Sequence, residues 1–180
     1  MTERSVTGSD TQEALLELAT LLIAVPSPSH AEGPLADLVE ASLRDCAWLV
    51  TERVEDNVVA RTESGRSRRV VVAGHLDTVP ATDENAHPRR QDDSIYGVGA
   101  ADMKGGLAVL LHLARSLERP EVDITWCFYA CEEVEQRHNG MRRVFEARPD
   151  LLGADAAILA EPTAGVVEAG CQGTLQVRVE

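Results

Sequence analysis

Apolar residues recur along the chain with two different spacings, which predict helices alternating with strands. Leu15, Leu18 and Leu22 share one stripe of a helix that opens at a capping-box sequence, residues 10–13. Helices are predicted over residues 10–25, 34–45, 105–117 and 140–147. Strands are predicted over residues 48–53, 57–61, 69–73, 122–130 and 155–160, with a last β pair over 166–168 and 174–179. The polar segment 81–94 predicts a surface loop, followed by a short extended piece at 95–96.

This order of elements determines the predicted fold class. Strands separated by helices favour an α/β fold with a mostly parallel sheet that helices flank on its faces. The two early strands, 48–53 and 57–61, are close in sequence and allow an antiparallel pair. The 180 residues suffice for one ordinary domain with a hydrophobic core.

Composition narrows the classes of partner. Hydrophobic residues make up 44% and charged residues 26% of the chain, a normal globular balance. The net charge of −13 argues against a nucleic-acid partner, because phosphate binding needs clustered Lys and Arg. No apolar run is long enough to span a bilayer, and the first dozen residues lack the apolar region of a secretory signal. The four cysteines form no CxxC pair. We therefore expect a cytoplasmic protein with reduced thiols and no membrane partner.

The first candidate for chemistry is the pair His75 and Asp77, which closes the predicted strand 69–73. Residues two apart in a strand point to the same face. A histidine that ligates a metal usually donates its other ring N–H to a carboxylate, which fixes its tautomer and orientation. His75 as ligand with Asp77 behind it has this form, although a histidine at a strand end is also a common structural residue.

Further carboxylates lie after strands or between glycines. Asp102 stands between two glycine pairs, Glu132 and Glu133 follow the predicted strand 122–130, and Glu161 follows the strand 155–160. Ligands of open α/β sheets bind at the carboxyl ends of the strands. Each of these acids taken singly is an ordinary solvated charge, but together they favour one site at that edge.

The adjacent Glu132 and Glu133 indicate what such a site could do. Two neighbouring carboxylates repel, and a divalent cation compensates them. Successive side chains diverge, so one Glu can ligate metal while the other acts as general base for hydrolysis. Asp102 has two oxygens and could bridge two ions. Ligands of this kind suit Zn²⁺, or less selectively Mn²⁺ and Co²⁺. Cys131 could add a thiolate, but a small buried residue at a strand end is the simpler interpretation.

Four strings then resemble a known family. GHLDTVP at 74–80, GVGAADMKGG at 97–106, CEEVE at 131–135 and AEPT at 160–163 are similar to the motifs of the dinuclear-zinc aminoacylases and carboxypeptidases called M20. The resemblance covers residues 13–180, and the fold it implies is the zinc exopeptidase type of α/β sheet. The set of strings is specific for the family and less so for the substrate.

The resemblance implies a role for each candidate residue. His75 and Glu161 would ligate one zinc, Glu133 the other, and Asp102 both. Glu132 would be the general base. Asp77 would orient His75, and the peptide bond after Asp102 would be cis.

The resemblance also implies a function. The expected activity is zinc-dependent hydrolysis of a small N-acyl amino acid, with Co²⁺ or Mn²⁺ as substitutes. The first candidate reaction removes succinate from N-succinyl-LL-2,6-diaminopimelate, a step of lysine and diaminopimelate biosynthesis. The alternatives are deacetylation of acetylornithine, another M20 deacylase or carboxypeptidase activity, a non-catalytic metal-binding domain, and an α/β domain whose acidic loops are merely solvated. The complete enzyme is expected to be a homodimer.

The chain departs from the family in its length, because the members of the family are considerably longer. The resemblance places residues 1–174 in the N-terminal part of the catalytic domain and residues 175–180 at the start of a lid and dimerisation domain. A late histidine ligand of the second zinc would then lie beyond residue 180. The other histidines, His30, His87, His112 and His138, are poor substitutes. We therefore expect a fragment that binds the second zinc weakly and is inactive alone.

Overall fold

The fold, a computed structural model that describes residues 8–170, is built on a sheet of strand order β1-β2-β6-β3-β7. The strands are β1 (Leu49–Val54), β2 (Asn57–Thr62), β3 (Arg69–His75), β6 (Asp123–Tyr129) and β7 (Ala156–Leu159). β1 pairs antiparallel with β2, and β2 with β6, whereas β3 pairs parallel with both β6 and β7. Within this sheet β2 therefore runs against its neighbours. The mainly parallel α/β sheet and the antiparallel early pair are confirmed.

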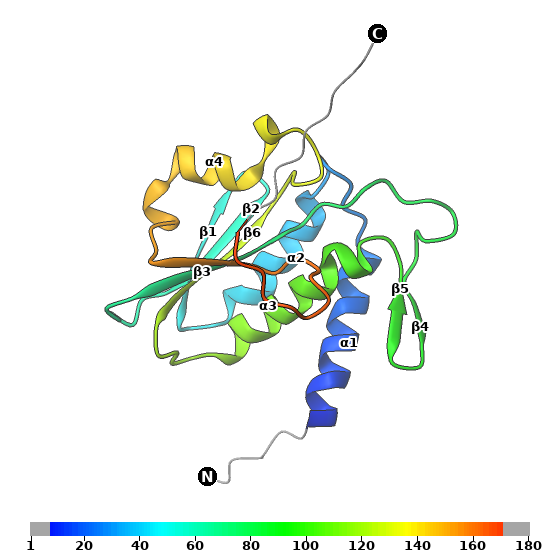
Figure 1. Cartoon of the computed structure of the whole chain (residues 1–180), viewed down its shortest axis with the longest axis horizontal. Helices are drawn as coiled ribbons and strands as arrows, with labels where there is room; N and C mark the ends of the chain where they lie inside the picture. Colours follow the sequence, from blue (N-terminus) through cyan, green and yellow to red (C-terminus); the bar gives the residue numbers. More distant parts are fainter. Residues whose placement is uncertain (1–7, 171–180) are drawn as a thin grey trace.

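Helices cover both faces of the sheet (Figure 1). α1 (Gly8–Ala24), α2 (Gly33–Arg44) and α3 (Gly105–Ser116) lie on one side, and α4 (Gly140–Ala147) lies on the other. Leu22, Leu35 and Leu111 are fully buried on the three-helix side, and Val144 of α4 is fully buried on the other. Each such side chain stabilises the fold by about 1.5–3 kcal/mol. In the part of the chain that the structure describes, no helix is long and apolar enough to cross a membrane.

The end of β3 is shaped by a close approach of another segment. A Cβ atom on Gly74 would lie 2.6 Å from the terminal methyl carbon of Met103. Met103 belongs to an irregular turn, Ala100–Lys104, that precedes α3 and in which the backbone dihedrals of Asp102 and Met103 are not helical. Glycine at 74 therefore lets this turn pack directly against the strand, beside His75.

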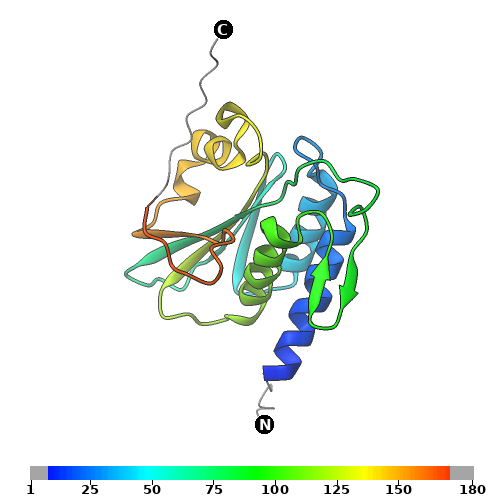
Figure 2. The same ribbon diagram turned by 45° about the vertical axis from the view of Figure 1, so that its right-hand side comes forward.

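Some predicted elements differ from the structure. α1 begins at Gly8, so Asp10 lies in its first turn and the predicted start at Asp10 is late. The extended piece predicted at 95–96 is confirmed as part of β5 (Ser94–Tyr96). The loop predicted over 81–94 is wrong in its second half, where β4 (Arg89–Gln91) pairs with β5 in a hairpin beside α1 (Figure 2). These short strands are largely exposed, so no alternation of apolar residues marks them. An ion pair between Arg90 and Glu13 fastens the hairpin to α1.

The last predicted β pair is not observed where it can be described. Residues 166–168 form no strand, and Val167 is almost completely exposed. Among the described residues no strand lies alongside them to accept their hydrogen bonds. The predicted partner, 174–179, and the proposed lid residues 175–180 lie outside the described part of the chain. The predicted domain division therefore stays a prediction.

Asp123, at the start of β6, offers a test of the fold. Its buried carboxylate accepts hydrogen bonds from the Thr62 hydroxyl and from the backbone amides of Ser64 and Arg66. Burial raises the pKa of Asp123, but these hydrogen bonds outweigh that effect and hold it below its ordinary value of 3.8. An Asp123→Asn variant is expected to lose about 2 kcal/mol of the free energy of unfolding at neutral pH, because an amide nitrogen replaces one acceptor.

The sign of the pH dependence follows from the lowered pKa. The native state binds the Asp123 proton less readily than the unfolded state, so this contribution is present above the unfolded pKa and declines as the pH falls below it. Urea unfolding at neutral pH and below the ordinary aspartate pKa measures the difference. The difference in the free energy of unfolding between the unaltered chain and Asp123→Asn should become smaller in acid. Equal stability of these two proteins at neutral pH would contradict the assignment.

Candidate metal centre

Three parallel strands end at the same edge of the sheet and bring the candidate residues together. His75 is the last residue of β3 and lies opposite Tyr129, the last residue of β6. The main chain after β6 continues to Glu132 and Glu133, and the chain after β7 reaches Glu161 within two residues. Because the strands are parallel, their carboxyl ends carry these side chains to one place.

His75, Asp102 and Glu161 form the centre of the site. His75 Nε2 lies 3.0 Å from an Asp102 carboxylate oxygen and 3.9 Å from a Glu161 carboxylate oxygen. One ligand atom from each residue lies within 4.8 Å of the others. Zinc–nitrogen and zinc–oxygen bonds of about 2.0–2.2 Å place the donor atoms around one ion roughly 3–4 Å apart. The donor set and its spacing therefore fit a divalent metal ion.

The His75 ring is oriented by a main-chain carbonyl. Nδ1 lies 2.9 Å from the carbonyl oxygen of Asp77 and 3.5 Å from the Asp77 carboxylate. A carbonyl oxygen only accepts hydrogen bonds, so Nδ1 carries a hydrogen and Nε2 faces Asp102 and Glu161. The sequence predicted that Asp77 would orient His75, and the shorter contact comes from its backbone. This arrangement presents Nε2 as the ligand atom.

The charge around His75 favours a cation. Burial lowers the pKa of His75, but hydrogen bonds with Asp77 and Asp102 outweigh it and raise the pKa to about 9. Burial raises the pKa of Glu161, and the nearby Asp102 carboxylate raises it further against the opposing effect of His75. A proton and a divalent cation compete for the same groups, so metal affinity at this site rises with pH.

The Asp77 carboxylate also holds the turn after β6. It is fully buried and accepts hydrogen bonds from the backbone amides of Glu132 and Glu133, at 2.9 and 3.0 Å, and from the Ser29 hydroxyl at 2.8 Å. Burial raises the pKa of Asp77, but the hydrogen bonds from His75 and the two amides lower it to about 2. Asp77 therefore ties the turn after β6 to the end of β3. Spacing in the sequence did not indicate this contact.

The side chains of Glu132 and Glu133, which both lie in that turn, differ in their surroundings. The Glu132 side chain is exposed, whereas Glu133 is half-buried. Burial and the nearby Asp102 carboxylate raise the pKa of Glu133. Glu133 is not part of the three-residue cluster, so its role as a ligand stays a prediction. The exposed Glu132 carboxylate is free to meet water, as a general base must be.

The turn that carries Asp102 has two notable features. The Asp102–Met103 peptide bond is cis, so that prediction is confirmed. Lys104, two residues on, is fully buried and its ammonium donates a hydrogen bond to the Val25 carbonyl at the end of α1, at 2.7 Å. Burial lowers the pKa of Lys104 to about 8. This lysine fastens the Asp102 turn to α1, a contact the sequence did not predict.

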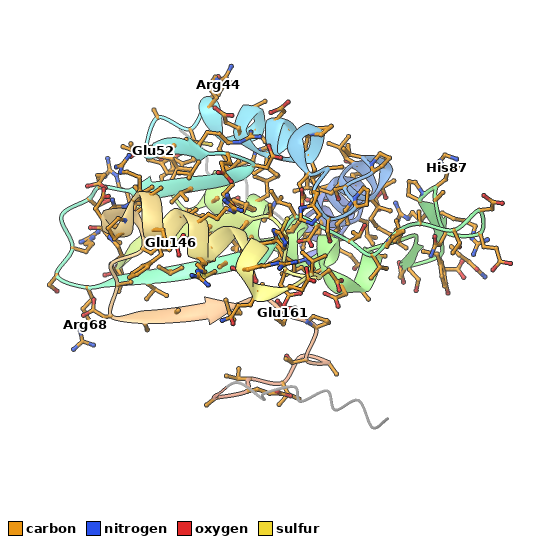
Figure 3. The ribbon with its side chains drawn as sticks, turned by 90° about the horizontal axis from the view of Figure 1, so that it is seen from above. Arg44, Glu52, Arg68, His87, Glu146 and Glu161 are labelled. Atoms are coloured by element: carbon orange, nitrogen blue, oxygen red, sulfur yellow. The ribbon has the colours of Figure 1, made fainter. Side chains whose placement is uncertain are left out.

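The remaining candidates lie apart from the cluster. His87 projects from the hairpin side of the molecule, far from Glu161 (Figure 3), and His112 lies on α3. The rings of His30 and His138 meet edge-to-face with centroids 5.0 Å apart, in a cavity of about 340 Å³ that Cys131 also lines. Burial raises the pKa of Cys131 to about 11, which favours the thiol over the thiolate. Within the described residues the metal cluster includes none of these side chains.

Comparisons with known proteins agree with this geometry. A Mycobacterium tuberculosis protein named "Putative succinyl-diaminopimelate desuccinylase DapE" is 52% identical over 90% of this chain and 46% of its own length. An acetylornithine deacetylase of Erwinia tasmaniensis is 30% identical over 82% of this chain and 43% of its own length. The chain thus spans about half the length of the curated relatives it matches.

A solved structure and a family model complete the comparison. The Bacillus subtilis protein YXEP, described as a dinuclear metal binding peptidase from the M20 family, matches with a TM-score of 0.62 and 16% identity. The match covers 85% of this chain and 43% of that one, and it establishes the fold. The model of Peptidase family M20/M25/M40 matches residues 71–176, which include every candidate ligand at the sheet edge. The strand-end cluster and this match lead to one conclusion: the chain belongs to Peptidase family M20/M25/M40.

Proposed function

We propose that the protein carrying this chain is a zinc-dependent amide hydrolase that removes succinate from N-succinyl-LL-2,6-diaminopimelate. The observation that carries the proposal is the cluster of His75, Asp102 and Glu161 next to the Glu132–Glu133 turn. Membership of the M20/M25/M40 family supports amide-bond hydrolysis as the reaction class.

The residues of this chain divide the work between holding metal and moving a proton. His75, Asp102 and Glu161 would hold one ion, and Glu133 together with Asp102 would contribute to holding another. Bound zinc supplies Lewis-acid polarisation of the amide carbonyl and lowers the pKa of water. Glu132 takes the proton of the attacking water and delivers it to the departing amine. Asp77 holds the backbone of Glu132 and thereby keeps the base beside the cluster.

The succinyl substrate is favoured over the acetyl substrate by one observation. The relative that carries the desuccinylase name is 52% identical, against 30% for the acetylornithine deacetylase. Deacetylation of acetylornithine is therefore the second candidate. A homodimer and a cytoplasmic setting are part of the same proposal, and the described cysteines, which are free and buried, are compatible with a reducing compartment.

Hydrolysis assays with both substrates test this proposal. The full product of the gene that encodes this chain should release succinate from N-succinyl-LL-2,6-diaminopimelate with a higher kcat/KM than it releases acetate from acetylornithine. The activity should disappear with chelation and return with Zn²⁺. Preference for acetylornithine would support the second candidate, and hydrolysis that survives complete metal removal would contradict the proposal.

A further inference from the structure

The turn after β6 is held by a second buried carboxylate besides Asp77. The backbone amides of three consecutive residues, Cys131, Glu132 and Glu133, donate to carboxylate oxygens. Two of them donate to Asp77. The first, Cys131, donates to Glu32 at 3.0 Å. Glu32 lies almost a hundred residues away in the sequence and has no part in the mechanism above.

Glu32 directs its side chain to this turn instead of to its own helix. It occupies the N-cap position of α2, where a side-chain oxygen commonly accepts a hydrogen bond from the helix, yet its side chain makes no such bond. The same carboxylate oxygen that accepts from Cys131 also accepts from the His30 amide at 3.1 Å and the Cys131 thiol at 3.3 Å. Glu32 is only 1% exposed. A buried carboxylate is costly unless it is hydrogen-bonded, so these contacts account for its place.

The backbone conformation of Cys131 explains why this residue needs a stabilising contact. Cys131 has a φ of +57°, in the left-handed region that residues with a side chain seldom adopt. Such a conformation persists only where the surroundings hold it. Cys131 immediately precedes Glu132, so its backbone sets the direction in which the next two side chains leave the sheet. The Glu32 contact holds the Cys131 amide, and Asp77 holds the two amides that follow.

The loop that carries Glu32 is itself fixed to the site. The Ser27 hydroxyl donates to the carbonyl of Leu76, and the Thr78 amide donates to the carbonyl of Ser27. Ser29 donates to the Asp77 carboxylate. The segment from Ser27 to Glu32 is thus joined to the residues after β3 and to the turn after β6. It connects the end of the strand that carries His75 with the turn that carries Glu132 and Glu133.

From this arrangement we propose that Glu32 is a positioning residue: through the Cys131 amide it sets the Glu132–Glu133 turn, and so the placement of the base and of a metal ligand. The inference rests on the proposed function for the roles of Glu132 and Glu133. The contact itself joins two residues of this chain and can be measured independently of metal binding.

The test uses this chain and two readouts, with Glu32→Ala, Glu32→Gln and the control Asp123→Asn. Asp123 is also a buried carboxylate that accepts backbone amides, but it lies at the opposite end of β6. The first readout is hydrogen exchange of the amides of residues 131–133 without metal. The second is the Kd for the second, weaker Zn²⁺ ion, the one that Glu133 is proposed to ligate. Glu32→Ala should speed exchange by about 10-fold, as for one lost charged hydrogen bond, and weaken Zn²⁺ binding by about 10-fold.

The other variants separate positioning from general stability. Glu32→Gln keeps an acceptor oxygen and should restore most of both properties. Asp123→Asn should lower stability and leave both the amide exchange of residues 131–133 and the Zn²⁺ affinity unchanged.

If the Glu32→Ala variant does not fold, Glu32→Asp replaces it, because its shorter side chain cannot reach Cys131 equally well. The expected direction of both changes is the same. Unchanged exchange, or faster exchange with unchanged Zn²⁺ affinity, would overturn the proposal, as would an equal loss of affinity in Asp123→Asn. If the unaltered chain binds no Zn²⁺ while exchange responds as expected, the proposed metal function fails and the Glu32 fastening of the turn stands.

Discussion

Replacing His75 with alanine is expected to weaken Zn²⁺ binding by more than about 100-fold, the upper end of the loss seen for residues that merely orient a ligand. His75 is 1% exposed, and its Nδ1 contact with the Asp77 carbonyl fixes Nε2 toward Asp102 and Glu161. The alanine variant keeps only carboxylates, of which Asp102 is about half exposed and therefore well hydrated. A competition titration with a chelating dye measures the change in Kd.

A matched histidine variant controls for effects unrelated to the site. His87 is exposed and lies on the hairpin side of the molecule, so His87→Ala should bind Zn²⁺ as the unaltered chain does (Figure 3). Equal affinities of the unaltered chain and His75→Ala would mean that the strand-end cluster does not bind the metal. An equal loss in both variants would show that the loss is not specific to the strand-end cluster.

Replacing Glu132 with glutamine is expected to lower kcat by about 10²–10⁴-fold, the usual contribution of a general base, while metal content stays the same. Glutamine has nearly the same size and keeps the backbone amide that donates to Asp77. It cannot take a proton from water, however. The measurement pairs turnover of the full gene product with metal analysis of the same sample.

Glu133 provides the comparison for that result. Glu133→Gln is expected to lower metal content, because the neighbouring carboxylate is proposed as a ligand. A Glu132→Gln variant that loses metal and a Glu133→Gln variant that keeps it would show that the two roles are exchanged. Full activity of Glu132→Gln would remove the general base from the proposal altogether.

Hydrophobic periodicity predicted much of the fold because most elements are buried on one or both faces. β6 is buried along its whole length, and α4 has the bounds its apolar stripe predicts. The hairpin β4–β5 escaped prediction because it is exposed and is held by side-chain contacts such as that of Arg90 with Glu13. Such a contact joins residues far apart in the sequence and leaves no periodic signal.

The candidate site could be predicted as a set of residues but not as a network. Parallel strands bring His75 and Glu161 to one edge, which follows from the order of elements. The partners of the Asp77 carboxylate do not follow from that order, because they depend on how the turn after β6 folds back toward β3. Glu32 escaped prediction for the same reason. Glu32 lies just before the predicted helix 34–45, and only the folded chain places it against Cys131.

An anomalous difference map, measured at the X-ray absorption edge of zinc from a crystal of this chain grown with Zn²⁺, tests directly whether the strand-end cluster binds metal. We expect a peak within bonding distance of His75 Nε2 and of carboxylate oxygens of Asp102 and Glu161. A well-ordered crystal with no peak there, or with zinc bound only at other surface residues, would contradict this expectation.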